Sequence, residues 1–156
     1  MRLHLLAVGT RMPGWVRDGF EDYARRLPRQ CALTLVEIPT GPRTRSADPA
    51  RARTEEGRKM LRAIPQWAYV VALEERGRAF DTRKLAARLQ EWMDAGRGVT
   101  LLAGGPDGLA EPCRERADLA WSLSPLTLPH GLVRVVVAEQ VYRAWSLLGG
   151  HPYHRE

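Results

Sequence analysis

Cysteine and long apolar segments are both scarce in this sequence of 156 residues. The two cysteines, Cys31 and Cys113, are too few for a disulfide framework and lack the CxxC spacing of a metal or redox site. We expect both to be reduced packing residues. No segment approaches the ~20 consecutive apolar residues that cross a bilayer, and the first residues lack the apolar run of a signal peptide. These absences predict a cytoplasmic protein with no membrane partner.

Lysine is also rare, because Lys59 and Lys84 are the only two and arginine supplies the rest of the 24 basic residues. Against 18 acidic residues they give a formal net charge of +6. Such a charge is typical of a protein that binds phosphate, although a high-GC genome also enriches arginine. Most of the charge lies in residues 40–63, whose basic members are Arg43, Arg45, Arg51, Arg53, Arg58, Lys59 and Arg62.

Short apolar strands and amphipathic helices alternate along the chain. The expected strands are 3–8, 32–38, 67–73, 99–103 and 121–128, and the expected helices are 13–27, 49–63, 82–95, 112–119 and 132–148. This order predicts an α/β fold, a single domain over residues 1–156 with a mostly parallel sheet of five to six strands flanked by helices. A ligand normally lies beyond the carboxyl ends of such strands, so Leu73, the Gly104-Gly105 turn and the loop after Trp121 should converge on one pocket.

Two segments at that predicted edge are candidates for ligand binding. The turn Gly104-Gly105-Pro106-Asp107-Gly108 lets a ligand approach the backbone, but it matches neither GxGxxG nor GxxxxGK[ST], which argues against ATP. The segment WSLSPLTLPHGLVR, residues 121–134, could form an apolar slot for a flat ring such as adenine. A plain tight turn and an ordinary strand remain the alternatives.

The expected helix 132–148 is apolar almost all round, which predicts that one side covers the core and the other a second subunit in a homodimer. Its polar residues include Glu139 and Arg143, whose spacing of four fits an intrahelical ion pair as well as catalysis. His151 and His154 lack the further ligands that a metal site needs, so no metal is expected. No GxSxG motif supports a serine hydrolase.

Three motifs together resemble one known family over the whole chain. They are LLAVGTRMPGWV near the amino terminus, LLAGGPDGL in the centre and SLSPLTLPHGLVRVVVAEQVYRAWSLLGGHPYHRE at the carboxyl end. In these motifs and in length the sequence resembles the RlmH family of small SPOUT-class methyltransferases, which methylate N3 of a pseudouridine in 23S ribosomal RNA. The resemblance implies a SPOUT fold with a C-terminal trefoil knot, a homodimer and S-adenosylmethionine as the methyl donor.

The resemblance also implies roles for particular residues. The cofactor site falls on Leu73, Gly104 and residues 123–128, and the turn analysis adds Gly105; the last segment comprises Leu123, Ser124, Pro125, Leu126, Thr127 and Leu128. The Arg-rich region after Pro39 and the tail then form the side that meets RNA.

Methylation at N3 requires an imide proton to leave, so a base or a cation that stabilises the anion is needed. In the tail His154 is the candidate base, with His130 beside the cofactor loop as its rival. Tyr153 is a candidate stacking or hydrogen-bonding group, and Arg143 and Arg155 are candidate anion stabilisers. A frayed terminus is the alternative for the tail.

Two other classes fit parts of the sequence. A non-catalytic module that binds RNA or the ribosome would need the basic face without a cofactor pocket. A flavodoxin-like enzyme would bind its ligand without RNA. Binding of S-adenosylmethionine distinguishes the methyltransferase from the module, and the absorbance of the purified protein would reveal a flavin.

Overall fold

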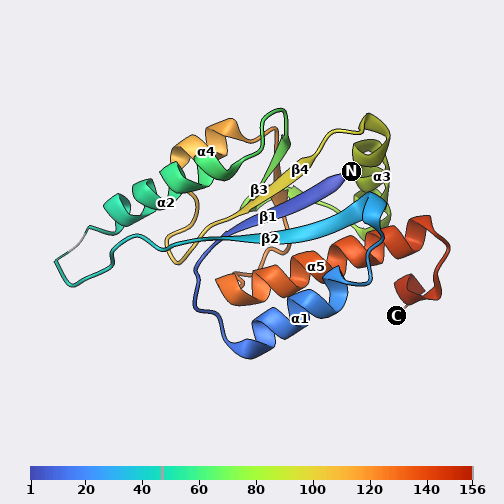
Figure 1. The fold of residues 1–156 in the computed structure, drawn as a ribbon, viewed down its shortest axis with the longest axis horizontal. Coiled ribbons are helices and arrows are strands. Elements are labelled where there is room, and N and C mark those ends of the chain that lie inside the picture. Colours follow the sequence, from blue (N-terminus) through green and yellow to red (C-terminus); the bar gives the residue numbers. More distant parts are fainter. Residues whose placement is uncertain (47, 156) are drawn as a thin grey trace.

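A computed structural model describes residues 1–46 and 48–155 of the chain. Five parallel strands form one sheet in the order β2-β1-β4-β3-β5 (Figure 1). They are β1 (Arg2–Val8), β2 (Ala32–Ile38), β3 (Tyr69–Ala79), β4 (Val99–Ala103) and β5 (Leu119–Ser122). The predicted α/β class and the parallel sheet are confirmed, while the trefoil knot stays a prediction.

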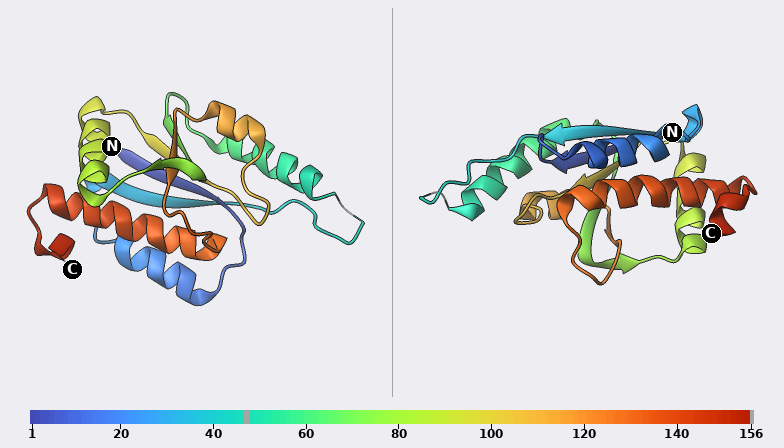
Figure 2. Two further views of the ribbon diagram at one scale, coloured as in Figure 1. Left: turned by 180° about the vertical axis from the view of Figure 1, so that it is seen from behind. Right: turned by 90° about the horizontal axis from the view of Figure 1, so that it is seen from below.

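Helices cover both faces of the sheet (Figure 2). They are α1 (Gly14–Ala24), α2 (Pro49–Ala63), α3 (Thr82–Ala95), α4 (Glu111–Arg116) and α5 (His130–Leu148), with short 3₁₀ turns η1 (Arg29–Cys31) and η2 (Pro152–Arg155). Helices α1, α3 and α5 pack over one face, and α2 and α4 lie side by side over the other. No helix among the described residues has the length and apolarity that a bilayer crossing requires.

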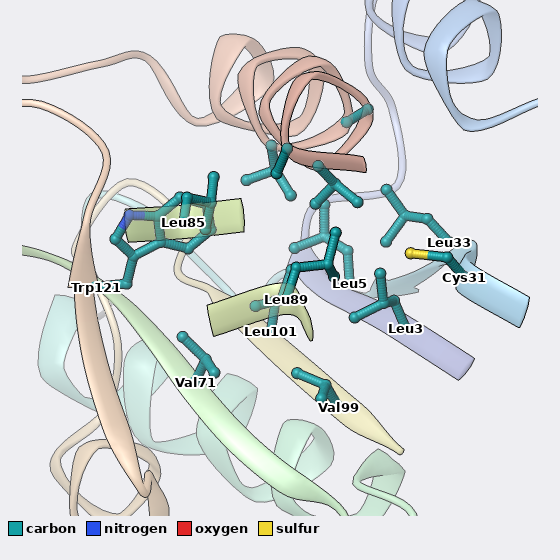
Figure 3. Close-up of a cluster of buried hydrophobic side chains, with 14 of the residues drawn as sticks. Leu3, Leu5, Cys31, Leu33, Val71, Leu85, Leu89, Val99, Leu101 and Trp121 are labelled. Atoms are coloured by element: carbon teal, nitrogen blue, oxygen red, sulfur yellow. The ribbon is translucent and has the colours of Figure 1, made fainter. Parts of the chain in front are cut away.

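The continuous apolar strands reflect a sheet that is buried on both faces. Neighbouring residues of one strand enter different cores: Leu5 packs under α1, α3 and α5, whereas Leu6 packs under α2 and α4. Val70 and Val71 divide in the same way, and Figure 3 shows Leu5 and Val71 within the first of these cores. The two cysteines are free and buried, one in each core, as expected.

Local sequence signals set several helix ends. The side chain of Asp48 accepts a hydrogen bond from the Ala50 N–H at 3.0 Å, which caps α2. Asp81 caps α3 through the Lys84 N–H at 2.8 Å, and α3 ends where Gly96 takes a left-handed φ of 65°.

Two predicted strands differ from the structure, and both differences lie beside the predicted pocket. Strand β3 does not end at Leu73 but continues to Ala79, with a register shift between Leu73 and Arg78 in its pairing with β5. Strand β5 ends at Ser122, six residues before the predicted end. The hydroxyl of Ser122 donates to the Ser124 carbonyl at 3.1 Å, a local bond that competes with strand pairing. The residues from 123 to 129 therefore form a loop.

Candidate functional site

A cavity of about 890 Å³ lies at the carboxyl edge of the sheet. Its walls come from β3, the turn after β4, the loop after β5 and the first turns of α5. Of the predicted cofactor residues, the wall contains Leu73, Gly104, Gly105, Leu123, Ser124, Leu126, Thr127 and Leu128, but not Pro125. His130 also lines the cavity. The structure thus brings together the three segments that the strand order predicts.

The glycines of the turn leave no room for side chains. A Cβ on Gly104 would lie 2.4 Å from the backbone carbon of Gly108, and one on Gly105 would lie 2.9 Å from a methyl of Val8. The Gly108 N–H donates to the Gly105 carbonyl at 3.0 Å, and Gly108 has a φ of 77°. The segment is therefore a tight turn, as one interpretation of its sequence predicts, and it also forms part of the cavity wall, while ligand binding there stays a prediction.

Charged residues that the sequence analysis did not select line one side of the cavity: Glu74, Glu75, Arg76 and Arg114. Arg114 Nε donates to Glu74 Oε1 at 2.6 Å, and this bond raises the pKa of Arg114. The signal was present in the sequence, because two carboxylates directly follow the apolar part of β3. An expected strand end at Leu73 places these carboxylates in a loop, which conceals their position at the cavity.

The loop between β5 and α5 presents an apolar surface held by polar contacts. The Leu126 N–H donates to the hydroxyl of Ser124 at 2.9 Å. Leu126 is 71% exposed, whereas Leu123 and Leu128 are half-buried. An exposed leucine on a cavity wall offers contact area to a flat apolar ring.

The tail is ordered rather than frayed, because η2 folds back onto α5. The phenol of Tyr153 donates to Glu139 Oε1 at 3.0 Å, and its ring lies 4.7 Å from that of Tyr142. Arg143 Nη2 lies 2.6 Å from the same carboxylate oxygen of Glu139, as the predicted intrahelical ion pair requires. His154 Nδ1 contacts the carbonyl oxygen of His151.

The candidate catalytic residues fall at opposite ends of α5. His130 begins the helix at the cavity, whereas Arg143 lies in its last third and Tyr153, His154 and Arg155 follow its end. A helix of 19 residues is about 28 Å long. In Figure 1 the short turn η2, in dark red, lies next to the far end of α5. Within one chain, the tail and a ligand in the cavity are therefore separated by most of the molecule.

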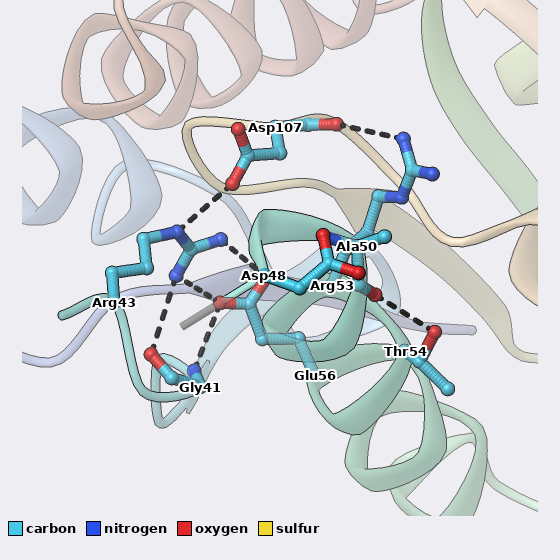
Figure 4. A network of polar contacts seen from close by, with 8 residues as sticks. All are labelled: Gly41, Arg43, Asp48, Ala50, Arg53, Thr54, Glu56 and Asp107. Carbon is cyan, nitrogen blue, oxygen red and sulfur yellow. Dashed lines mark hydrogen bonds and ion pairs between the residues drawn. The ribbon is translucent and has the colours of Figure 1, made fainter. Parts of the chain in front are cut away.

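The Arg-rich segment contains two kinds of arginine. Arg43 pairs with Glu56 and with Asp107 of the glycine turn, and Arg53 Nη1 reaches the Asp107 carbonyl at 3.5 Å (Figure 4). Arg45 is exposed. So are Arg51, Arg58 and Arg62, which share one stripe of α2 at spacings of seven and four, opposite the buried Ala52, Glu56 and Met60. No cluster of potential metal ligands occurs among residues 1–46 and 48–155.

Tyr153 is expected to make the stability of the protein depend on pH in the alkaline range. Burial, with hydrogen bonds to Tyr23 and Glu139, raises the pKa of Tyr153. The folded state therefore holds this proton more tightly than the unfolded state, in which a tyrosine titrates near pH ~10. Its contribution to stability is present below that pH and is lost as the pH rises above it. We expect the free energy of unfolding to fall more steeply above about pH 10 in the wild type than in Tyr153→Phe, measured by urea unfolding. Equal slopes would contradict this assignment.

Comparison with known proteins gives consistent results at three levels. The family model described as "Predicted SPOUT methyltransferase" matches residues 1–154. A protein of Thioalkalivibrio sulfidiphilus named ribosomal RNA large subunit methyltransferase H is 61% identical over 100% of both chains. One of the same name from Methylococcus capsulatus is 56% identical over 99% of this chain and 100% of that protein.

Solved structures support the fold. A probable methyltransferase from Bordetella pertussis Tohama I aligns with a TM-score of 0.55 and 15% identity over 92% of this chain and 95% of that chain. A probable methylase family protein from Haemophilus influenzae aligns with a TM-score of 0.53 and 10% identity over 97% of this chain and 69% of that chain. At these identities the likeness concerns the fold alone.

Proposed function

Because this chain belongs to the SPOUT methyltransferase family, we propose that it transfers the methyl group of S-adenosylmethionine to N3 of a pseudouridine in 23S ribosomal RNA. The relatives at 51–61% identity over nearly their full length are named as large-subunit ribosomal RNA methyltransferases, which supports the RNA substrate. The observation that carries the proposal is the cavity at the carboxyl edge of the sheet, built from the three segments that the family motif supplies.

The residues of the cavity fit S-adenosylmethionine. The loop 123–128 offers leucines for an adenine ring and backbone groups for its edge, and the glycine turn admits a ligand against its backbone. Glu74 and Glu75 supply carboxylates suited to ribose hydroxyls and an ammonium group. When bound, the cofactor supplies an activated methyl group on a sulfonium. The chain itself holds and aligns the two reactants. Such alignment can lower the activation barrier by ~7 to 11 kcal/mol.

The distance between tail and cavity supports a homodimer in which each tail acts at the partner's cavity. Helix α5 presents half-buried apolar residues along its length, including Val135, Val136 and Leu147, and Trp15 of the neighbouring α1 is exposed. An isologous contact through this face would bury these side chains. It would also bring the tail of one subunit towards the cavity of the other. Within a single chain, the tail and the cavity stay at opposite ends of α5.

His154 is our candidate for the base at N3. In the neutral ring, Nδ1 donates to the His151 carbonyl, which leaves Nε2 as the acceptor for the imide proton. Tyr153 stays protonated at neutral pH and so serves as a donor or stacking group, while Arg155 is exposed and suited to stabilise the imide anion. Arg143 contributes through Glu139, which also holds Tyr153. His130 at the cavity is the rival base.

Transfer of labelled methyl from S-adenosylmethionine to ribosomes that lack the modification tests this function. We expect label at pseudouridine N3 with the wild type, and a loss of at least ~100-fold with Gly104→Ala, because the new Cβ would collide with the backbone of Gly108 and distort the cavity wall. Gly98→Ala is the matched control, since its Cβ would meet only the Arg2 carbonyl at an ordinary 3.6 Å. Ribosome binding without transfer would instead support the non-catalytic module.

A further inference from the structure

Glu56 is a buried carboxylate that the chemistry described above does not use. Its side chain is only 2% exposed, on the face of α2 that packs against the sheet. Burying a charge is costly unless it is paired and hydrogen-bonded. Glu56 meets both conditions, because Oε2 accepts the Gly41 N–H at 2.9 Å and Oε1 accepts Arg43 Nη2 at 2.9 Å, while Arg43 Nη1 also contacts Oε2.

The same arginine reaches across to the glycine turn. Arg43 Nε donates to Asp107 Oδ2 at 2.9 Å, so one guanidinium binds two carboxylates from distant parts of the chain (Figure 4). Asp107 lies in the turn whose other four residues, 104–106 and 108, line the cavity. Its carboxylate points towards Arg43 (Figure 4), and Asp107 itself does not line the cavity. The hydrogen bonds to Glu56 and Asp107 raise the pKa of Arg43, so its guanidinium stays charged at neutral pH.

The link connects two parts of the chain that have different tasks in the proposed function. On one side is the segment that carries the exposed Arg45 and Arg51, which we assign to RNA. On the other is the wall assigned to the cofactor. A side chain shared by both parts favours one arrangement of each, and this is the requirement for a coupling free energy between two sites.

We propose that the link formed by Glu56, Arg43 and Asp107 positions the glycine turn for the cofactor and couples cofactor binding to RNA binding. This inference rests on the proposed function. Arg43, Asp107 and Glu56 are positioning residues, since they act through the turn and through the Arg-rich segment. By reciprocity, RNA that fixes the segment tightens cofactor binding, and bound cofactor tightens RNA binding by the same factor.

Asp107→Ala is the cleanest test variant. Asp107 lies at the tip of a turn and is 34% exposed, so its loss breaks the link and leaves Glu56 paired with Arg43. Removal of Arg43 would instead leave Glu56 buried without its partner and endanger folding. Arg43→Lys is a second variant, because a lysine keeps the positive charge near Glu56 but lacks the fork that binds both carboxylates. Asp94→Ala, an exposed carboxylate at the end of α3, is the control.

The experiment measures binding of labelled S-adenosylhomocysteine by equilibrium dialysis, with and without saturating unmodified ribosomes. For the wild type and Asp94→Ala we expect ribosomes to lower the Kd about fivefold or more. For Asp107→Ala and Arg43→Lys we expect that ratio to fall to about one, and the double variant to be no worse than either single variant. Ribosome affinity measured without the cofactor should stay within about threefold of the wild type in all variants.

The outcomes separate this inference from the function on which it rests. If Asp107→Ala keeps the wild-type ratio, the link does not carry the coupling. If the wild type itself shows a ratio of one, the coupling does not exist. Methyl transfer stands in both cases. If the two test variants lose thermal stability and bind the ligand more weakly but retain the ratio, the link has only a structural role. If the wild type binds no S-adenosylhomocysteine under either condition, the proposed function fails.

Discussion

A mixed dimer of two inactive chains is expected to recover methyl transfer. One chain carries Gly104→Ala, which disables the cavity, and the other carries His154→Ala, which removes the candidate base. In a mixed dimer, the intact tail of the first chain can serve the intact cavity of the second. With chains that pair at random, half of the dimers are mixed and each has one of its two sites restored, so activity should return to about one quarter of the wild type.

The physical reason is the distance along α5. His130 and His154 lie at opposite ends of a 19-residue helix, and η2 is tied to the far end through Tyr153 and Glu139. A tail held in this way reaches a cavity only if that cavity belongs to the other subunit. The measurement is methyl transfer to unmodified ribosomes by a heterodimer purified through two different tags, for which about half of wild-type activity is expected.

Two homodimers, one of each variant, are the controls. Each should show a loss of at least ~100-fold, the size typical for removal of a general base or of a binding contact at the reacting group. An inactive heterodimer would mean that His154 serves its own chain. An active His154→Ala homodimer would shift the role of base to His130, which lines the cavity of its own subunit.

Much of the fold could be predicted because its signals are local. Asp48 before Pro49 and Asp81 before Thr82 mark helix starts by capping, and Gly96 marks a helix end by its left-handed backbone. Strands such as Val99–Ala103 are recognisable because both of their faces are buried.

The continuation of β3 could not be predicted in the same way. Its polar sequence resembles a loop, and it is a strand because of its pairing with β5, which is a tertiary contact. A Cβ on Gly77 would lie 2.7 Å from the backbone of Ala120, so the glycine permits the two strands to approach. The role of Gly77 is therefore evident only from the position of β5.

The candidate site likewise has one part that a general rule predicts and another part that depends on tertiary contacts. The convergence of Leu73, Gly104 and the loop 123–128 follows from the rule that the carboxyl ends of parallel strands meet, and the structure brings these residues together. The double contact of Arg43 with Glu56 and Asp107 depends on positions 13 and 64 residues away in the sequence. Charge composition alone treats Arg43 like Arg45, although Arg43 pairs with both Glu56 and Asp107 and its side chain is only 25% exposed.

The exposed arginines of α2 are expected to determine how steeply RNA binding depends on salt. Arg51, Arg58 and Arg62 form an exposed stripe on α2, and each phosphate that such a side chain neutralises releases condensed counterions from the RNA. Replacing all three with glutamine is expected to reduce the slope of log K against log salt by about 2 to 3, because each neutralised phosphate contributes ~0.7 to 0.9 to that slope. Ribosome binding measured over a range of salt concentrations gives this slope.

A matched variant shows whether position or net charge matters. Arg2, Arg29 and Arg83 are also exposed, and they lie outside the Arg-rich segment. Their replacement with glutamine removes the same three charges, so a general attraction between a basic protein and RNA would weaken equally in both triple variants. If α2 contacts phosphates, the slope changes only in the first variant, because counterion release requires contact and long-range attraction is screened beyond about 10 Å at moderate salt. Equal changes in both variants would mean that the stripe on α2 is not where RNA binds.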